Sequence, residues 1–108
     1  MSILSFLDHF LEQIALQFKE ALPSVRKLLL VSSRDAILEN ASQIDQWLAM
    51  SSTGQLSKQD LEWLIKANLD LSKLKILETS GLSLARIDEM RGQVTRTLIS
   101  SIISATGL

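Results

Sequence analysis

The sequence predicts an all-α protein, a compact bundle of about four helices whose antiparallel neighbours are joined by short loops. Apolar residues recur at the three- and four-residue spacing of an α-helix along nearly the whole chain. The single proline, Pro23, and the glycines Gly54 and Gly81 fall between these periodic segments, as helix breakers do. The chain has 108 residues, the length of one domain, so we expect residues 1–108 to form a single helical-bundle domain.

Four helices follow from this punctuation, at about residues 3–22, 24–50, 57–80 and 83–105. Pro23 ends the first helix, and its fixed φ suits the first turn of the second. Ser57 is followed three residues later by Asp60, a variant of the capping box that begins the third helix. Gly81 suits the left-handed residue after a helix, and Ser83 suits the N-cap of the fourth.

The second helix has an alternative description. Ser32 and Ser33 interrupt its pattern, and Asp35 is a residue that can open a helix. A break at this serine pair is therefore left open.

The first helix has the clearest apolar face, which includes all three phenylalanines of the chain. Leu16 is the one apolar residue on its polar side. We interpret this segment as a helix packed on the core. The alternative is a helix lying on a membrane surface, but such helices carry Lys and Arg on the polar face, whereas this face carries three acids and one lysine.

The third and fourth helices carry more apolar residues than a bundle of this size needs. The third has one stripe through Trp63 and a second, nearly opposite stripe through Leu61. A four-helix bundle buries one stripe per helix, and monomers rarely expose a large contiguous apolar patch. The surplus predicts self-association, most simply as a homodimer, or contact with another helical protein. The residues predicted to form this interface are Leu61, Ile65, Leu69, Ile76, Ile99 and Ile103.

Composition excludes several classes of protein. Hydrophobic residues make up 46% of the chain and charged residues 21%, which excludes general disorder. There is no cysteine and only one histidine, so thiolate and multi-histidine metal sites cannot form within one chain. The net charge of −1 predicts no strong attraction to nucleic acid or to an anionic membrane.

Targeting and membrane-spanning signals are not found. Residues 1–22 lack a basic start, and charged residues interrupt what would be the apolar region of a signal peptide. No uninterrupted apolar run reaches the roughly 18 residues of a candidate span. We therefore expect a cytoplasmic protein.

Catalytic chemistry finds no support in the residues. His9 lies on the polar face of the first helix beside Asp8 and Glu12, and we expect it to be solvated. The chain has no glycine-rich phosphate loop, no nucleophile elbow and no calcium loop. The expectation is a protein that is not an enzyme, without cofactor, metal or small-molecule substrate.

Residues 73–92 are the best candidate for a known motif, a helix-turn-helix with Gly81 in the turn. As a DNA-binding segment it would use Ser83, Arg86 and Arg91. Against this, Asp88 and Glu89 would repel phosphate, and Leu77 stands where a small residue normally lets the helices approach. An αα-hairpin accounts for the same pattern.

The residues therefore favour a non-enzymatic interaction or assembly module. A DNA-binding transcriptional regulator that uses residues 73–92 is the alternative. A third class, a small enzyme or ligand carrier with its site between helices, has the least support because no catalytic group is evident.

Overall fold

Helices follow one another along residues 2–106, which are the residues described by the computed structural model. Within this part of the chain there are five α-helices, two 3-10 helices and no strand, so the predicted all-α class is confirmed. The elements in chain order are η1 (Ile3–Ser5), α1 (Leu7–Gln17), α2 (Pro23–Glu39), α3 (Ala41–Ser52), α4 (Lys58–Asn68), η2 (Ser72–Ser80) and α5 (Leu84–Thr106).

The predicted starts of the second, third and fourth helices are confirmed, whereas the first α-helix starts at Leu7 and not near residue 3. Pro23 occupies the first turn of α2. Ser57 and Asp60 form the complete capping box of α4, in which each side chain accepts a hydrogen bond from the other residue's backbone N–H. Gly81 adopts the left-handed conformation, with φ of 85°, after η2. The Ser83 hydroxyl accepts a hydrogen bond from the backbone N–H of Arg86 at the start of α5. Local sequence signals therefore account for these helix boundaries.

The predicted number of about four helices is wrong, because three of the predicted helices are divided. The first consists of η1 and α1, separated at Phe6, and α1 ends at Gln17 instead of running to residue 22. The second ends at Asn40, which separates α2 from α3, and not at Ser32-Ser33, which lie buried inside α2. The Asn40 side-chain amide donates hydrogen bonds to the carbonyl oxygens of Ala36 (2.7 Å) and Asp70 (3.0 Å). Its side-chain oxygen accepts from the Asp70 N–H at 3.3 Å. The break at Asn40 thus coincides with hydrogen bonds to Asp70, a residue 30 positions further along the chain.

The third predicted helix is divided near Asp70, the residue that is hydrogen-bonded to Asn40. Leu69 is extended, and residues 72–80 form a 3-10 helix instead of continuing α4. A carboxylate oxygen of Asp70 accepts a hydrogen bond from the Ser72 N–H at 2.9 Å, which opens the next turn. Hydrogen bonds from the Ser72 hydroxyl and N–H lower the pKa of the Asp70 carboxyl below its usual range. The two breaks therefore stabilise each other.

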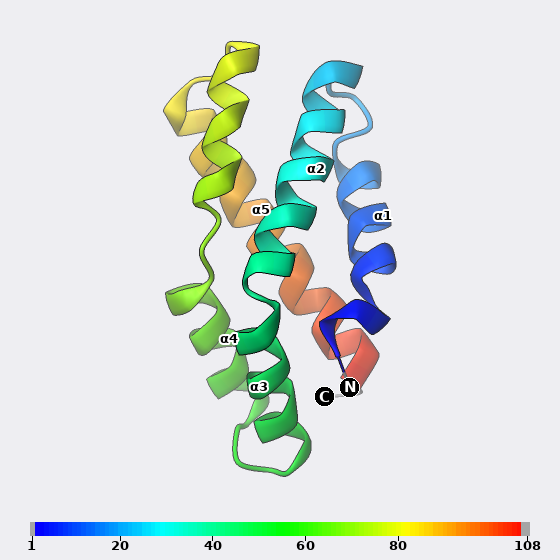
Figure 1. Cartoon of the computed structure of the whole chain (residues 1–108), viewed down its shortest axis with the longest axis vertical. Helices are drawn as coiled ribbons and strands as arrows, with labels where there is room; N and C mark the ends of the chain where they lie inside the picture. The colour runs from blue at the N-terminus through cyan, green and yellow to red at the C-terminus, as the bar shows by residue number, and fades with distance from the viewer. Residues whose placement is uncertain (1, 107–108) are drawn as a thin grey trace.

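The helices pack into an elongated body with extents of 44 × 22 × 20 Å (Figure 1). The segments α2 and η2 lie side by side, and α1 packs against both α2 and α5. In Figure 1, α5 crosses diagonally behind the other helices. The start of η1, which precedes α1, is held by Asp45 of α3, whose carboxylate accepts a hydrogen bond from the Ile3 N–H at 2.6 Å. Helix α1 consequently has a neighbouring helix on each side.

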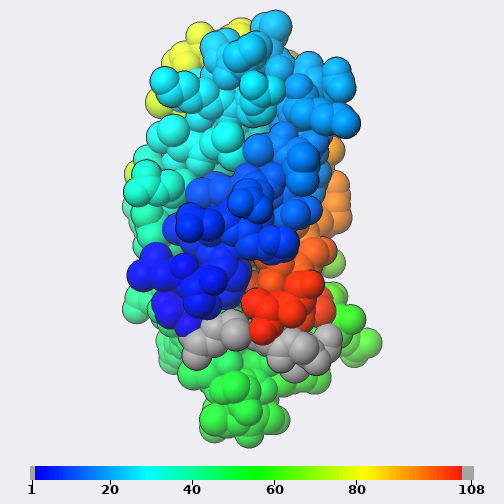
Figure 2. Space-filling view, turned by 90° about the vertical axis from the view of Figure 1, so that its right-hand side faces the viewer, coloured from blue at the N-terminus to red at the C-terminus, as the bar shows by residue number. Residues whose placement is uncertain are grey.

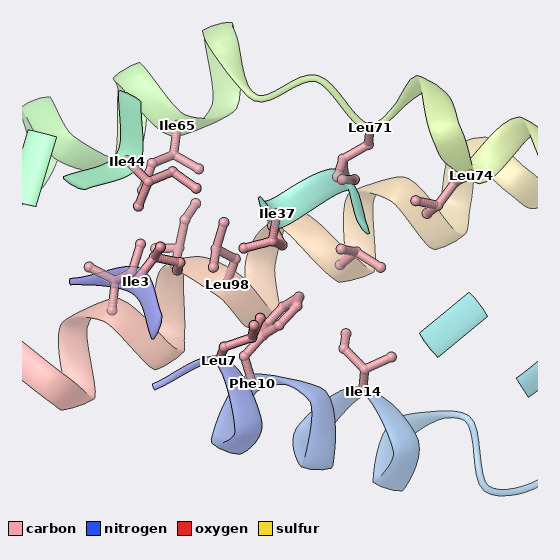
Figure 3. Close-up of a cluster of buried hydrophobic side chains, with 14 of the residues drawn as sticks. Ile3, Leu7, Phe10, Ile14, Ile37, Ile44, Ile65, Leu71, Leu74 and Leu98 are labelled. Carbon is pink, nitrogen blue, oxygen red and sulfur yellow. The ribbon is translucent and has the colours of Figure 1, made fainter. Parts of the chain in front are cut away.

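One apolar core runs through the body (Figure 3). All three phenylalanines are buried in it, as predicted from the apolar face of the first helix, while Leu16 is exposed. One apolar stripe of α5 is buried as well, namely Ile87, Met90, Val94, Leu98 and Ile102. Figure 3 shows Ile37 of α2 and Leu98 of α5 between the side chains of α1 and the side chains of Ile44, Ile65, Leu71 and Leu74. The core thus fixes which face of α1 points inward.

Candidate functional site

Helix α1 exposes two flanks of opposite character. Figure 2 shows α1 in blue across this side of the molecule, with α2 in cyan on one side and α5 in orange and red on the other. His9, Gln13 and Gln17 follow one another at four-residue spacing and face α5. Leu11 and Ala15 face α2. Since both flanks carry hollows in the surface, both are candidate sites.

The flank toward α5 forms a polar pocket of about 450 Å³. No apolar side chain lines it, which is unusual where two helices pack. From α5 it is lined by residues at the three- and four-residue spacing that places them on one face of the helix. The complete lining is His9, Gln13, Gln17, Gln93, Arg96, Thr97, Ser100, Ser101 and Ser104.

Three of these polar groups are withdrawn from solvent. Thr97 is 6% exposed and Ser101 is 3% exposed. The Gln17 amide donates a hydrogen bond to the Thr97 hydroxyl across the pocket. The side-chain oxygen of Gln93 is buried and has no hydrogen-bond partner among the described residues. A buried acceptor without a donor is costly. Because solvent does not reach this oxygen, the Gln93 side chain must turn toward the pocket before a ligand can donate to it.

Arg96 supplies the permanent charge of the polar pocket. It forms no ion pair with any acid of the described residues, and no Asp or Glu lines the pocket. A Cβ atom on Gly92 would lie 3.4 Å from a terminal nitrogen of Arg96, so the guanidinium lies back over this glycine. The pocket lining therefore combines one permanent positive charge with amide and hydroxyl groups.

The flank toward α2 forms an apolar groove of two adjoining hollows, of about 470 and 490 Å³, which share Glu12 and Ala15. Leu16 and Val31 stand exposed along it. Asp8 and Glu12 line its edge on α1, and Arg34 lines its edge on α2. We call this surface the α1/α2 groove. An apolar floor between charged edges is the arrangement that binds an amphipathic helix.

The predicted interface residues do not form one exposed surface. Leu61, Ile65 and Ile99 are buried in the core of the same chain. Leu69 and Ile103 are partly buried against that core, and Ile76 is 47% exposed. The break at residues 69–71 is the physical reason, because α4 and η2 can each bury a different face. Leu61 and Ile65 of α4 face the core, whereas in η2 Leu74 faces the core and Ile76 faces solvent.

The residues proposed for DNA contact are engaged within α5. Ser83 caps the helix. Arg86 forms an ion pair with Glu89, and Arg91 forms one with Asp88, each at 2.9 Å. The segment before Gly81 is the 3-10 helix η2 rather than an α-helix. The acids that the sequence placed beside these arginines thus neutralise them locally.

Among residues 2–106 no group of three or more His, Asp or Glu side chains is arranged to hold a metal ion. In the same range, no helix is long and apolar enough to cross a bilayer.

Sequence reasoning missed the polar pocket, although a signal was present. Uncharged polar residues recur along α5 at positions 93, 97, 100, 101 and 104, and along α1 at positions 13 and 17. Each stripe alone is an ordinary solvated face. Only the packing of α1 on α5 brings the two together.

Comparison with known proteins gives no further guide to function. The chain matches no protein-family model, no curated protein and no solved structure.

Proposed function

We propose that the protein is a non-enzymatic helical interaction module that forms a homodimer through the α1/α2 groove. The self-association predicted from the sequence is retained, but on a different surface, because Leu61, Ile65 and Ile99 are covered within the chain. The cytoplasmic location predicted from the sequence is kept as part of this proposal.

The observation that carries the proposal is an apolar groove with its own protruding side chains. Leu16 is 62% exposed and Val31 is 46% exposed, and each stands beside a hollow. Burying one such side chain stabilises a complex by about 1.5–3 kcal/mol. A surface with both protrusions and hollows can be complementary to itself, as a two-fold dimer requires.

Charge supports a second copy as the occupant. Asp8 and Arg34 line the same hollow from opposite edges and form no ion pair with each other in the described chain. With a two-fold axis parallel to the groove, α1 of one copy faces α2 of the other at the same height. Asp8 then lies opposite Arg34 of the second copy. Charge complementarity of this kind fixes the register of an interface.

Sedimentation velocity between about 1 and 100 μM tests the proposal. We expect the wild type to dimerise in this range. Leu16→Glu combined with Val31→Glu places two charges in the apolar interface and is expected to give a monomer with an unchanged circular dichroism spectrum.

Leu84→Glu is the matched control, because Leu84 is 57% exposed but lies outside the groove. It should leave the dimer intact. A wild type that is monomeric at about 100 μM would overturn the proposal. So would a control variant that dissociates as readily as the groove variant.

A further inference from the structure

We propose that the polar pocket between α1 and α5 binds a small oxyanion that carries hydroxyl groups, namely a hydroxycarboxylate or a hydroxylated phosphate ester. The sequence predicted no small-molecule ligand. The pocket lies on the opposite flank of α1 from the α1/α2 groove, so this proposal does not depend on the proposed dimer.

The charge of the lining selects an anion. Arg96 is permanently charged, and no carboxylate competes for it within the pocket. This local charge stands out because the whole chain has a net charge of −1. The planar guanidinium matches two oxygens of a carboxylate or phosphate group at once.

The unpaired acceptor selects a ligand that also donates. The buried oxygen of Gln93 needs an N–H or O–H partner. The oxygens of a fully ionised anion cannot supply one, whereas a hydroxyl group next to the anionic group can. Gln93 and Arg96 are three residues apart on one helix, so they are neighbours along the pocket wall. One compact molecule can therefore contact both, once the Gln93 side chain turns its oxygen into the pocket.

The size and polarity of the pocket limit the ligand further. Its volume of about 450 Å³ is within the usual range for small-molecule sites, which runs from about 300 to 1,000 Å³. Such sites are mostly apolar when they take aromatic or drug-like ligands. This lining is polar throughout, which favours a small ligand with a polar group on every side.

The proposal can be tested by titrating candidate ligands into isotope-labelled protein. Two-dimensional NMR spectra of the backbone and glutamine side-chain amides are recorded at each ligand concentration. The probes are glycerate and glycerol 3-phosphate, which distinguish a carboxylate from a phosphate as the recognised anion. Inorganic phosphate and glycerol are the partial probes, since each carries only one half of the proposed chemistry. We expect saturable shifts at Gln13, Gln17 and Gln93 with at least one complete probe, and at least about tenfold weaker binding of both partial probes.

Three variants assign the contacts. Arg96→Gln is expected to lower the affinity for the complete probe by about tenfold to a hundredfold, the effect of losing a charge-assisted hydrogen bond. Arg86→Gln removes an arginine from the same helix outside the pocket and should change nothing. Gln93→Leu should lower the affinity for the complete probe and leave the affinity for inorganic phosphate unchanged.

Each of three outcomes would overturn the proposal. The first is the absence of saturable shifts with either complete probe at about 10 mM. The second is equal binding of inorganic phosphate and the complete probes, which would mean a general anion contact and no built site. The third is an equal loss of affinity in Arg86→Gln and Arg96→Gln, which would mean attraction by the overall charge of α5.

Discussion

The two flanks of α1 are built from the same helix yet differ in what they offer. Toward α2, Leu11 and Ala15 continue the apolar surface outward from the core, and the result is a groove between charged edges. Toward α5, Gln13 and Gln17 meet a polar face, and the result is a pocket without apolar lining. Both flanks lie beside the core face that holds Phe10 and Ile14.

One helix thus presents two surfaces with different physical chemistry. An apolar groove gains free energy from area removed from water and is suited to another helix. A polar pocket gains little from area, and it selects by hydrogen bonds and charge. The polar flank also carries a stability cost, the unpaired oxygen of Gln93, which is typical of sites kept for binding.

The largest expected effect comes from the inward face that separates the two flanks. Ile14→Asp places an unpaired charge at a side chain with no solvent exposure. We expect a loss of more than about 4 kcal/mol in the free energy of unfolding, enough to unfold the chain, since its whole stability is of order 5–15 kcal/mol. Circular dichroism with urea denaturation measures this loss.

The control for that variant is Leu16→Asp, two residues along the same helix but exposed in the groove. The free energy of unfolding of its monomer, measured by urea denaturation, should change by less than about 0.5 kcal/mol. If Leu16→Asp destabilised the monomer as strongly as Ile14→Asp, the groove would be part of the core and the distinction between the faces of α1 would fail.

A smaller effect, of opposite sign, is expected on the polar flank. Gln93→Leu removes the unpaired buried oxygen and keeps a side chain of similar size. We expect the free energy of unfolding to rise by about 1 kcal/mol, measured by urea denaturation. Gln59→Leu, at an exposed position of α4, is the matched control and should have little effect. A loss of stability in Gln93→Leu would show that the oxygen is satisfied, and the polar flank would then carry no cost.

The smallest effect is expected outside both flanks, at Asp70. Its pKa is lowered in the folded chain by the hydrogen bonds from Ser72. A lowered pKa contributes stability that is present above the unfolded-state pKa of about 4 and is lost as the pH falls through the folded-state value. Asp70→Asn should therefore reduce the dependence of stability on pH below about pH 5, measured by denaturation between pH 3 and 7. An unchanged pH dependence would contradict this assignment.

Sequence patterns predicted the parts of the fold that depend on local interactions. The capping box at Ser57, the left-handed Gly81 and the first-turn Pro23 each act within a few residues of the chain. The inward face of α1 was predictable for the same reason, because helical periodicity alone places Phe6, Phe10 and Ile14 together. The class of fold and the exposure of Leu16 follow from these local rules.

Tertiary structure alone decided where the long helices break and what covers their apolar faces. Asn40 and Asp70 are 30 residues apart, and each break depends on hydrogen bonds from the other. Those breaks bury Ile65 within the chain instead of leaving it for a partner. The polar pocket likewise exists only because α1 packs on α5, which brings Gln17 to Thr97 across 80 residues of sequence. Periodicity along one helix contains no information about which other helix it will face, and that is why the pocket could not be predicted from the sequence.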